Sequence, residues 1–393
     1  MHGDSGCDAT HIMLTPTDEE LAADKLDADA VDLLTDTMKR CGVVGISPGL
    51  SQDHVQVLHD AVEKELRPII ESRQRVKDTL TRAFAANLTL EELVDGSEGD
   101  KLCAEPVLAK SSGYGLAERT PGRLDYLLPW RPPFNDTWLT VNPLVLPLIS
   151  ALFGPDLQAF SKTPQADGPD LKSIRVIYAL PGAPMQDLHQ DTKKIFADIE
   201  WDKGIKRDYP ESPVHTPPYA LNFFIPLVDM HEEGTMAGPT QFALGTHRWS
   251  DAALHNGTVT TLGSFREQAG HFILADYRTV HRGLSNQLST PRPVVMLLYG
   301  RGWWNDHTDH SNEVPVPGEK GALRRILRAK RVAREGRKAQ CLRLLQARLQ
   351  NAWKSWQELP KQPMPPACPK PMPSVAPANH ALGRSSFSER IKD

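Results

Sequence analysis

PGAPMQDLHQDT, at residues 181–192, contains the triplet His189-Gln190-Asp191. On an extended strand, residues i and i+2 point to the same face. His189 can therefore offer an imidazole nitrogen, and Asp191 a carboxylate oxygen, to one metal ion. A third protein ligand has to come from elsewhere in the chain.

His281 is the candidate for that third ligand. It lies in the stretch LADYRTVHRG at residues 274–283, just after an apolar strand that ends in a turn. Two histidines and a carboxylate on one face of a metal leave the opposite positions open, which is the ligand set of non-haem Fe(II) oxygenases. Zinc enzymes also use two histidines and a carboxylate. The three residues predict a metal site without fixing the metal.

Arg292 favours iron over zinc. It lies eleven residues after His281, at the start of the β-branched and apolar run at residues 290–299, which reads as a buried strand. A buried guanidinium needs an anion, and its fork suits a carboxylate held by two hydrogen bonds. A dicarboxylate could chelate the metal at one end and meet Arg292 at the other. The co-substrate 2-oxoglutarate fits that description.

Four stretches resemble, in the same order, the phytanoyl-CoA dioxygenase family of Fe(II)/2-oxoglutarate oxygenases. They are PGAPMQDLHQDT at 181–192, NFFIPL at 222–227, AGPTQFALGTHR at 237–248, and DYRTVHRGLSN at 276–286 continuing to Arg292-Pro293. Leu244 replaces the proline of the family's usual Pro-Gly-Ser-His turn, a departure that is structural. The pattern His-x-Asp alone would occur often by chance, but the ordered set over roughly residues 170–305 is highly specific.

The resemblance implies that three residues bind iron and form the catalytic centre, namely His189, Asp191 and His281. It implies that Arg292 binds the far carboxylate of 2-oxoglutarate, and that Gln186 and Thr240 hydrogen-bond the co-substrate. A backbone-bracing amide is the alternative for Gln186, and an ordinary strand position is the alternative for Thr240. The presence of Asp191 argues against the halogenating variant of this chemistry, which needs that position vacant.

The expected fold is mainly β with flanking helices. Ten or so short strands between residues 174 and 299, broken by Gly and Pro, predict a double-stranded β-helix (a jelly-roll, cupin-like core). Helices are expected at 30–41, 53–66 and 75–86, and another ends before Gly154. The domains expected are an acidic, partly disordered N-terminus at 1–28, a dioxygenase domain at 29–315 with its core at about 170–305, a basic amphipathic helix at 320–359 and a Pro-rich disordered tail at 360–393.

Composition restricts the expected binding partners and cellular compartment. The net charge of −4 gives the whole molecule no bias toward nucleic acid or anionic membrane. No apolar run is long enough to span a bilayer, and no secretory signal is visible. The five cysteines are odd in number and far apart, which predicts free thiols and a cytoplasmic protein. They are Cys7, Cys41, Cys103, Cys341 and Cys368.

The segment at 320–338 carries nine positive charges against Glu335 alone, and leucines at heptad-like spacing follow it. It could bind an acidic partner, RNA or an anionic surface, associate with itself, or fold back on the domain as a solvated arm. The long stretch at 195–219, just after the first two metal ligands, reads either as a lid or as a surface excursion. For substrate recognition the candidates are Tyr178, Trp303, Trp304 and Arg123, with core packing as the alternative for the aromatic residues.

The resemblance implies an Fe(II)- and 2-oxoglutarate-dependent dioxygenase. With O2 as second co-substrate, it would hydroxylate a C–H bond of a small organic substrate and release succinate and CO2. Desaturation and ring formation remain open. Two other classes are kept as alternatives. One is a catalytically silent jelly-roll scaffold that acts through its basic helix, and the other is a zinc- or manganese-dependent hydrolase or isomerase.

Overall fold

The computed structural model describes most of the chain up to residue 304. The described residues are Cys7, 12–96, 99–107, 115–153, 170–191, 218–232, 235–236, 238–248, 262–264, 268–301, Trp304, 341–342 and 345–346. Of the sequence-based expectations, Trp303, Cys368, the tail at 360–393 and nearly all of the segments at 195–219 and 320–359 lie outside these residues.

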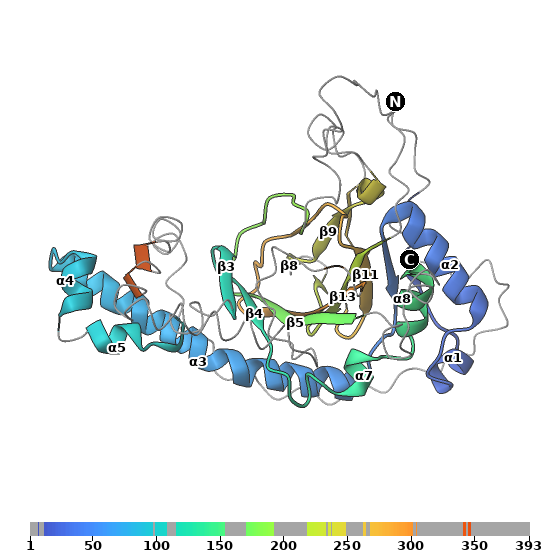
Figure 1. The fold of residues 1–393 in the computed structure, drawn as a ribbon, viewed down its shortest axis with the longest axis horizontal. Helices are drawn as coiled ribbons and strands as arrows, with labels where there is room; N and C mark the ends of the chain where they lie inside the picture. The colour runs from blue at the N-terminus through green and yellow to red at the C-terminus, as the bar shows by residue number, and fades with distance from the viewer. Residues whose placement is uncertain are drawn as a thin grey trace, which may run out of the picture.

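An eight-stranded sheet forms the centre of the molecule, in the order β1-β2-β11-β6-β13-β5-β4-β3 (Figure 1). Its neighbouring strands are antiparallel except for β1 and β2, which are parallel. The strands are β1 (Met13–Leu14), β2 (Val43–Ile46), β11 (Phe272–Asp276), β6 (Ala220–Pro226), β13 (Arg292–Gly300), β5 (Asp170–Ala179), β4 (Arg123–Leu127) and β3 (Leu116–Thr120).

Two smaller sheets complete the β structure. One has three antiparallel strands, β10 (Leu262–Ser264), β9 (Thr240–Ala243) and β12 (His281–Gly283), in that order. The other pairs β7 (His231–Glu232) with β8 (Thr235–Met236). Within the described residues the large sheet keeps two edges, β1 and β3, and does not close into a barrel. A sheet-rich fold with flanking helices is therefore confirmed, while the jelly-roll itself stays a prediction.

The two faces of the large sheet have different partners. On one, the helix face, Val295, Leu297 and Tyr299 of β13 belong to the large apolar cluster shared with the N-terminal helices. On the other, the inner face, Val294 and Phe224 pack with Phe242 of β9 in a second cluster. Successive side chains along a strand point to opposite faces, so both faces of the large sheet are buried against a cluster of apolar residues. The second cluster joins the large sheet to the three-stranded sheet.

Seven helices are described around the sheet, and α3 runs along it and continues beyond it toward α4 and α5 (Figure 1). They are α1 (Asp18–Ala22), α2 (Ala28–Cys41), α3 (Gln52–Ala85), α4 (Leu90–Asp95), α5 (Gly99–Cys103), α7 (Thr137–Thr140) and α8 (Leu146–Phe153). The expectation of two helices at 53–66 and 75–86 is wrong, because α3 is one helix of 34 residues. It continues through Pro68, and Leu58, Val62, Leu66, Val76 and Leu80 keep one apolar stripe in the core along its whole length. No described helix is long and apolar enough to cross a membrane.

Four of the five cysteines form disulfides, Cys7–Cys41 and Cys103–Cys341. The prediction of free thiols is therefore wrong for these four residues. The paired cysteines are 34 and 238 residues apart, and such separations give no spacing signal in the sequence. The expectation of a cytoplasmic protein loses the support that it took from free thiols.

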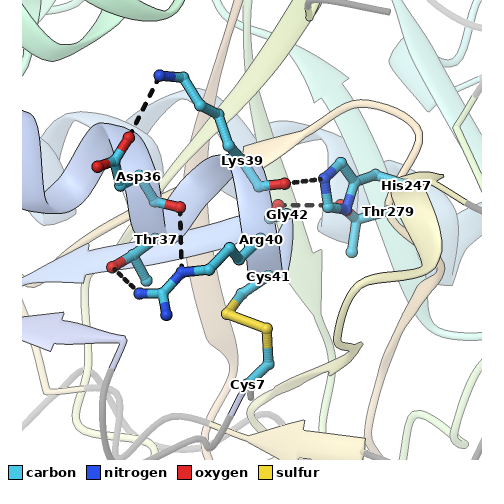
Figure 2. The surroundings of a disulfide bond; sticks show 9 residues. All are labelled: Cys7, Asp36, Thr37, Lys39, Arg40, Cys41, Gly42, His247 and Thr279. Atoms are coloured by element: carbon cyan, nitrogen blue, oxygen red, sulfur yellow. Dashed lines mark hydrogen bonds and ion pairs between the residues drawn. A yellow bond between two sulfur atoms is a disulfide. The ribbon is translucent and has the colours of Figure 1, made fainter. Parts of the chain in front are cut away.

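The Cys7–Cys41 disulfide lies where the end of α2 docks on the loop that precedes His281 (Figure 2). Gly42, at φ 77°, ends α2 in the left-handed conformation. Its carbonyl oxygen accepts hydrogen bonds from the backbone N–H of Asp276 and from Oγ1 of Thr279, each at 2.9 Å. A Cβ at position 42 would overlap the ring of His247, so glycine is needed there for space as well as for conformation.

Candidate metal centre and anion pocket

The three predicted metal ligands come together. His189 lies opposite His281 in an antiparallel bridge, and each backbone N–H donates to the other residue's carbonyl oxygen, at 3.0 and 2.9 Å. One ligand atom from each histidine and one from Asp191 all lie within 4.8 Å of one another. Asp191 places Oδ1 3.7 Å from Nε2 of His189 and Oδ2 3.6 Å from Nε2 of His281. This group can hold a metal ion.

Both imidazole rings are oriented by backbone carbonyl groups. Nδ1 of His189 donates to the carbonyl oxygen of Asp187 at 2.8 Å, and Nδ1 of His281 donates to that of Thr279 at 3.0 Å. A carbonyl oxygen only accepts, so each Nδ1 carries a proton, and in the neutral form of each ring Nε2 is the nitrogen with the lone pair. Such outer contacts fix the tautomer of metal-binding histidines.

The charge state of His189 also suits a metal ligand. Burial lowers the pKa of His189, and the nearby His281 lowers it further, against the opposing effect of Asp191. The neutral imidazole, which is the form that binds a metal, is therefore favoured near neutral pH.

Two amide side chains, those of Asn222 and Gln190, fix the position of Gln190-Asp191 in the triplet 189–191. Nδ2 of Asn222, on β6, donates to Oδ2 of Asp191 at 2.5 Å. Nε2 of Gln190 donates to the carbonyl oxygen of Arg278. Arg278 is itself fixed by a buried, two-pronged ion pair in which Nε and Nη2 donate to Asp276 at 2.8 and 2.6 Å. The segment around Asp191 is thus tied to both β6 and the end of β11.

A second polar site lies on the inner face of the large sheet, at the row formed by Arg123, Ala179 and Arg292. Ala179 of β5 pairs with Arg123 of β4 on one side and with Arg292 of β13 on the other. Both arginines are buried, at 3 and 1 % exposure. Burial and the positive charge of Arg292 lower the pKa of Arg123 to about 9.

Arg123 is only partly satisfied by the protein. Its Nη2 donates to the carbonyl oxygens of Leu284 at 2.8 Å and Pro184 at 3.2 Å. Its Nε and Nη1 are buried and have no hydrogen-bond partner among the described residues. The buried charge of Arg123 favours an anion beside these nitrogen atoms, because a buried charge is costly without a counter-charge.

Gly283 connects the two arginines to the candidate metal centre. It lies two residues after His281 on β12 and pairs with Thr240 of β9. Its backbone N–H donates to Oε1 of Gln186 at 2.9 Å. A Cβ at position 283 would overlap Nη1 of Arg123 and lie 2.8 Å from Oε1 of Gln186. The missing side chain is what leaves room for the arginine beside β12.

The remaining predicted residues are placed as follows. Gln186 braces the backbone of Gly283 through Oε1, in line with the structural alternative, and it does so beside Arg123. Thr240 is 8 % exposed, opposite Gly283. Tyr178 lies on the helix face, where its hydroxyl donates to Glu63 at 2.7 Å, so it does not line the site. Trp304 packs against the rings of Tyr219 and Tyr277, which is the core-packing alternative.

Asn222, Gly283 and the Asp276–Arg278 pair were not identified from the sequence as parts of the site. Asn222 and Arg278 lie inside stretches that resemble the oxygenase family, but residue type alone gives neither a role. A lone asparagine within an apolar strand is the only signal that could have pointed to Asn222.

No known family profile and no curated protein sequence matches the chain. Among solved structures it is similar to the non-heme alpha ketoglutarate dependent carbocyclase SnoK from nogalamycin biosynthesis, at 15% identity over 72% of this chain and 86% of that one, with a TM-score of 0.41. It is also similar to the epimerase SnoN in complex with Fe3+, alpha ketoglutarate and nogalamycin RO, at 16% identity over 75 and 93% of the two chains, with a TM-score of 0.38. The non-heme monooxygenase ThoJ, in its nickel complex, gives 13% identity over 68 and 76%, with a TM-score of 0.33. The phytanoyl-CoA dioxygenase family is not named among these neighbours, so membership of that family stays a prediction.

Proposed function

We propose that this protein is an Fe(II)- and 2-oxoglutarate-dependent oxygenase of the phytanoyl-CoA dioxygenase type, with a jelly-roll core. One observation carries the proposal. A His-Asp-His group that can hold a metal lies near two buried arginines, Arg123 and Arg292, and β12 connects them, with His281 in the His-Asp-His group and Gly283 against Arg123. A metal chelator that is also a dianion matches both ends of this arrangement.

The chain's own residues would do the positioning. His189, Asp191 and His281 hold Fe(II), and Nε2 of each histidine faces Asp191. Arg292, with Arg123 beside it, binds the far carboxylate of 2-oxoglutarate, while Gln186 and Thr240 line the route between the two ends. The rings of Phe242 and Phe224, with centroids 5.9 and 6.3 Å from that of His281, keep water from this side of the centre.

Bound at this site, Fe(II) supplies the activation of O2 that couples decarboxylation of 2-oxoglutarate to succinate and CO2 with oxidation of a substrate C–H bond. Hydroxylation of a small organic molecule is the outcome that we propose. The protein contributes orientation, a fixed charge for the co-substrate and a dry environment.

The alternatives explain less. In a silent scaffold, the buried Arg123 would have no bound anion to meet its unsatisfied Nε and Nη1. The basic segment at 320–359 and its acidic or self-associating partner lie outside the described residues and stay predictions. Metal content after anaerobic purification separates iron from zinc and manganese.

The test is Fe(II)-dependent conversion of 2-oxoglutarate to succinate without a prime substrate. Wild type should form succinate, and Asp191→Ala should not. Arg292→Ala should recover turnover only at much higher 2-oxoglutarate, since it lacks part of the carboxylate site. Arg75→Ala is the matched control, because Arg75 pairs with Glu105 on the exposed side of α3.

The control Arg75→Ala should behave as wild type at every 2-oxoglutarate concentration. No succinate from wild type, together with no absorption change when 2-oxoglutarate is added to the anaerobic Fe(II) protein, would exclude the oxygenase. Attention would then move to the basic segment and its partners.

A further inference from the structure

Asn222 is a polar residue in an apolar position. It lies on β6, a central strand of the large sheet, and pairs with Ala275 of β11 and Leu298 of β13. Its neighbours on the same face of β6 are Ala220 and Phe224. At 1 % exposure its amide is removed from solvent. Such a position normally takes an apolar side chain, so the amide calls for an explanation beyond packing.

The amide of Asn222 is directed at one atom of the metal centre. Nδ2 donates to Oδ2 of Asp191 at 2.5 Å. The amide orientation follows from chemistry, because Oδ1 turned toward the carboxylate would bring two acceptors together. Oδ1 of Asn222 is buried and has no hydrogen-bond partner among the described residues. An unmet buried acceptor costs about 1–3 kcal/mol, so the residue is poorly explained by stability alone.

Asp191 gains from a partner on a rigid strand. It follows the isolated bridge at His189, outside any described strand, and its side chain is 21 % exposed. A carboxylate there can rotate about its side-chain torsions unless a contact holds it. The donor on β6 fixes the plane in which Oδ1 and Oδ2 face the two histidines. A neutral amide does this without cancelling the negative charge that attracts a cation.

We propose that Asn222 is a positioning residue of the metal centre, holding the Asp191 carboxylate in the orientation that binds the metal. The inference rests on the proposed function only in taking Asp191 as a metal ligand. It assigns no step of the reaction to Asn222. Loss of an outer contact of this kind typically weakens metal affinity by about tenfold to hundredfold.

The experiment measures metal binding, with Co(II) as the probe in the anaerobic, metal-free full-length protein. Asn222→Leu has a similar volume and no donor. The matched control is Asn142→Leu, because Asn142 is also buried and its Nδ2 also donates, to the carbonyl oxygen of Trp138. We expect Asn222→Leu to bind Co(II) at least about tenfold more weakly and with a changed visible absorption spectrum, while Asn142→Leu keeps the wild-type affinity and spectrum.

A double mutant separates positioning from general damage. In an Asp191→Ala background the amide has no carboxylate to hold, so adding Asn222→Leu should leave the remaining Co(II) affinity unchanged. If Asn222→Leu does not fold, as judged by circular dichroism, Asn222→Ala takes its place in the same cycle. Wild-type affinity and spectrum in either folded variant, or an equal loss in the Asp191→Ala background, overturns the proposal. Failure of wild type to bind Co(II), or binding unaffected by Asp191→Ala, overturns the metal site itself and is a separate result.

Discussion

Arg123 and Arg292 lie on either side of Ala179, on the same face of three neighbouring strands. Burial of Arg123, and after it repulsion from Arg292, lowers the pKa of Arg123 to about 9. An anion bound beside Arg123 would therefore be stabilised. Anion binding at this arginine pair can therefore be measured in the metal-free protein.

We predict that Arg123→Leu reduces the stabilisation of the metal-free protein by glutarate, a dicarboxylate that has no keto group. Removing one of two buried cations weakens the carboxylate site, and a loss of about 2 kcal/mol or more in binding corresponds to an affinity at least about thirtyfold lower. The measurement is the Tm shift with rising glutarate. The control Arg75→Ala should show the same Tm shift as wild type. An equal Tm shift in Arg123→Leu would show that Arg123 is not part of the anion site.

Gly283→Ala should weaken 2-oxoglutarate binding without weakening metal binding. The new methyl group would overlap Nη1 of Arg123 and crowd Oε1 of Gln186, so the guanidinium has to move. Isothermal titration with 2-oxoglutarate in the Co(II) protein should give an affinity about tenfold lower or more, a change of about 1.4 kcal/mol. Gly96→Ala, at a helix end with φ −73°, is the control. A proportional loss of Co(II) affinity in Gly283→Ala would contradict the separation of the two ends.

The candidate metal ligands could be predicted because their chemistry is local. His189 and Asp191 share a strand-like i, i+2 spacing, and the residue types of His281 and Arg292 restrict what they can do when buried. Asn222 could not be found in this way, since its role depends on a contact with Asp191 across 31 residues. The two disulfides could not be predicted for the same reason, since their cysteines are 34 and 238 residues apart. The sequence predicts two helices, at 53–66 and 75–86, where the structure has the single helix α3, because a continuous apolar stripe holds the helix in the core through Pro68.

Cys7→Ser combined with Cys41→Ser should lower the free energy of unfolding. The bridge closes a chain segment of 34 residues, and the loss of such a constraint on the unfolded chain costs about 3–4 kcal/mol. Urea denaturation of the double variant and of wild type, each with and without a reducing agent, measures the difference. Adding the reducing agent should lower the unfolding free energy of wild type, because it opens both disulfides. It should lower that of the double variant by a smaller amount, because only Cys103–Cys341 is left to reduce. Identical midpoints in all four conditions would show that the bond contributes nothing.

His247 should make stability depend on pH in a defined window. Burial lowers its pKa from 6.5 to about 4, against the opposing charge of Asp276 and with added repulsion from Arg278. The unfolded chain, with an ordinary histidine pKa of about 6.5, binds the proton more tightly than the folded protein. The unfolding free energy should therefore fall as pH decreases from about 6.5 to about 4, by up to about 3 kcal/mol.

His247→Gln tests this dependence, because glutamine can still donate to the carbonyl oxygen of Lys39 but does not titrate. Chemical denaturation at pH 7.0 and at successive steps down to about pH 4 gives the two stability curves, and carboxylates contribute alike to both. The gap between the curves should be widest at pH 7 and close as the pH falls. Parallel curves would mean that His247 is not kept neutral by the docking of α2 on the loop before His281.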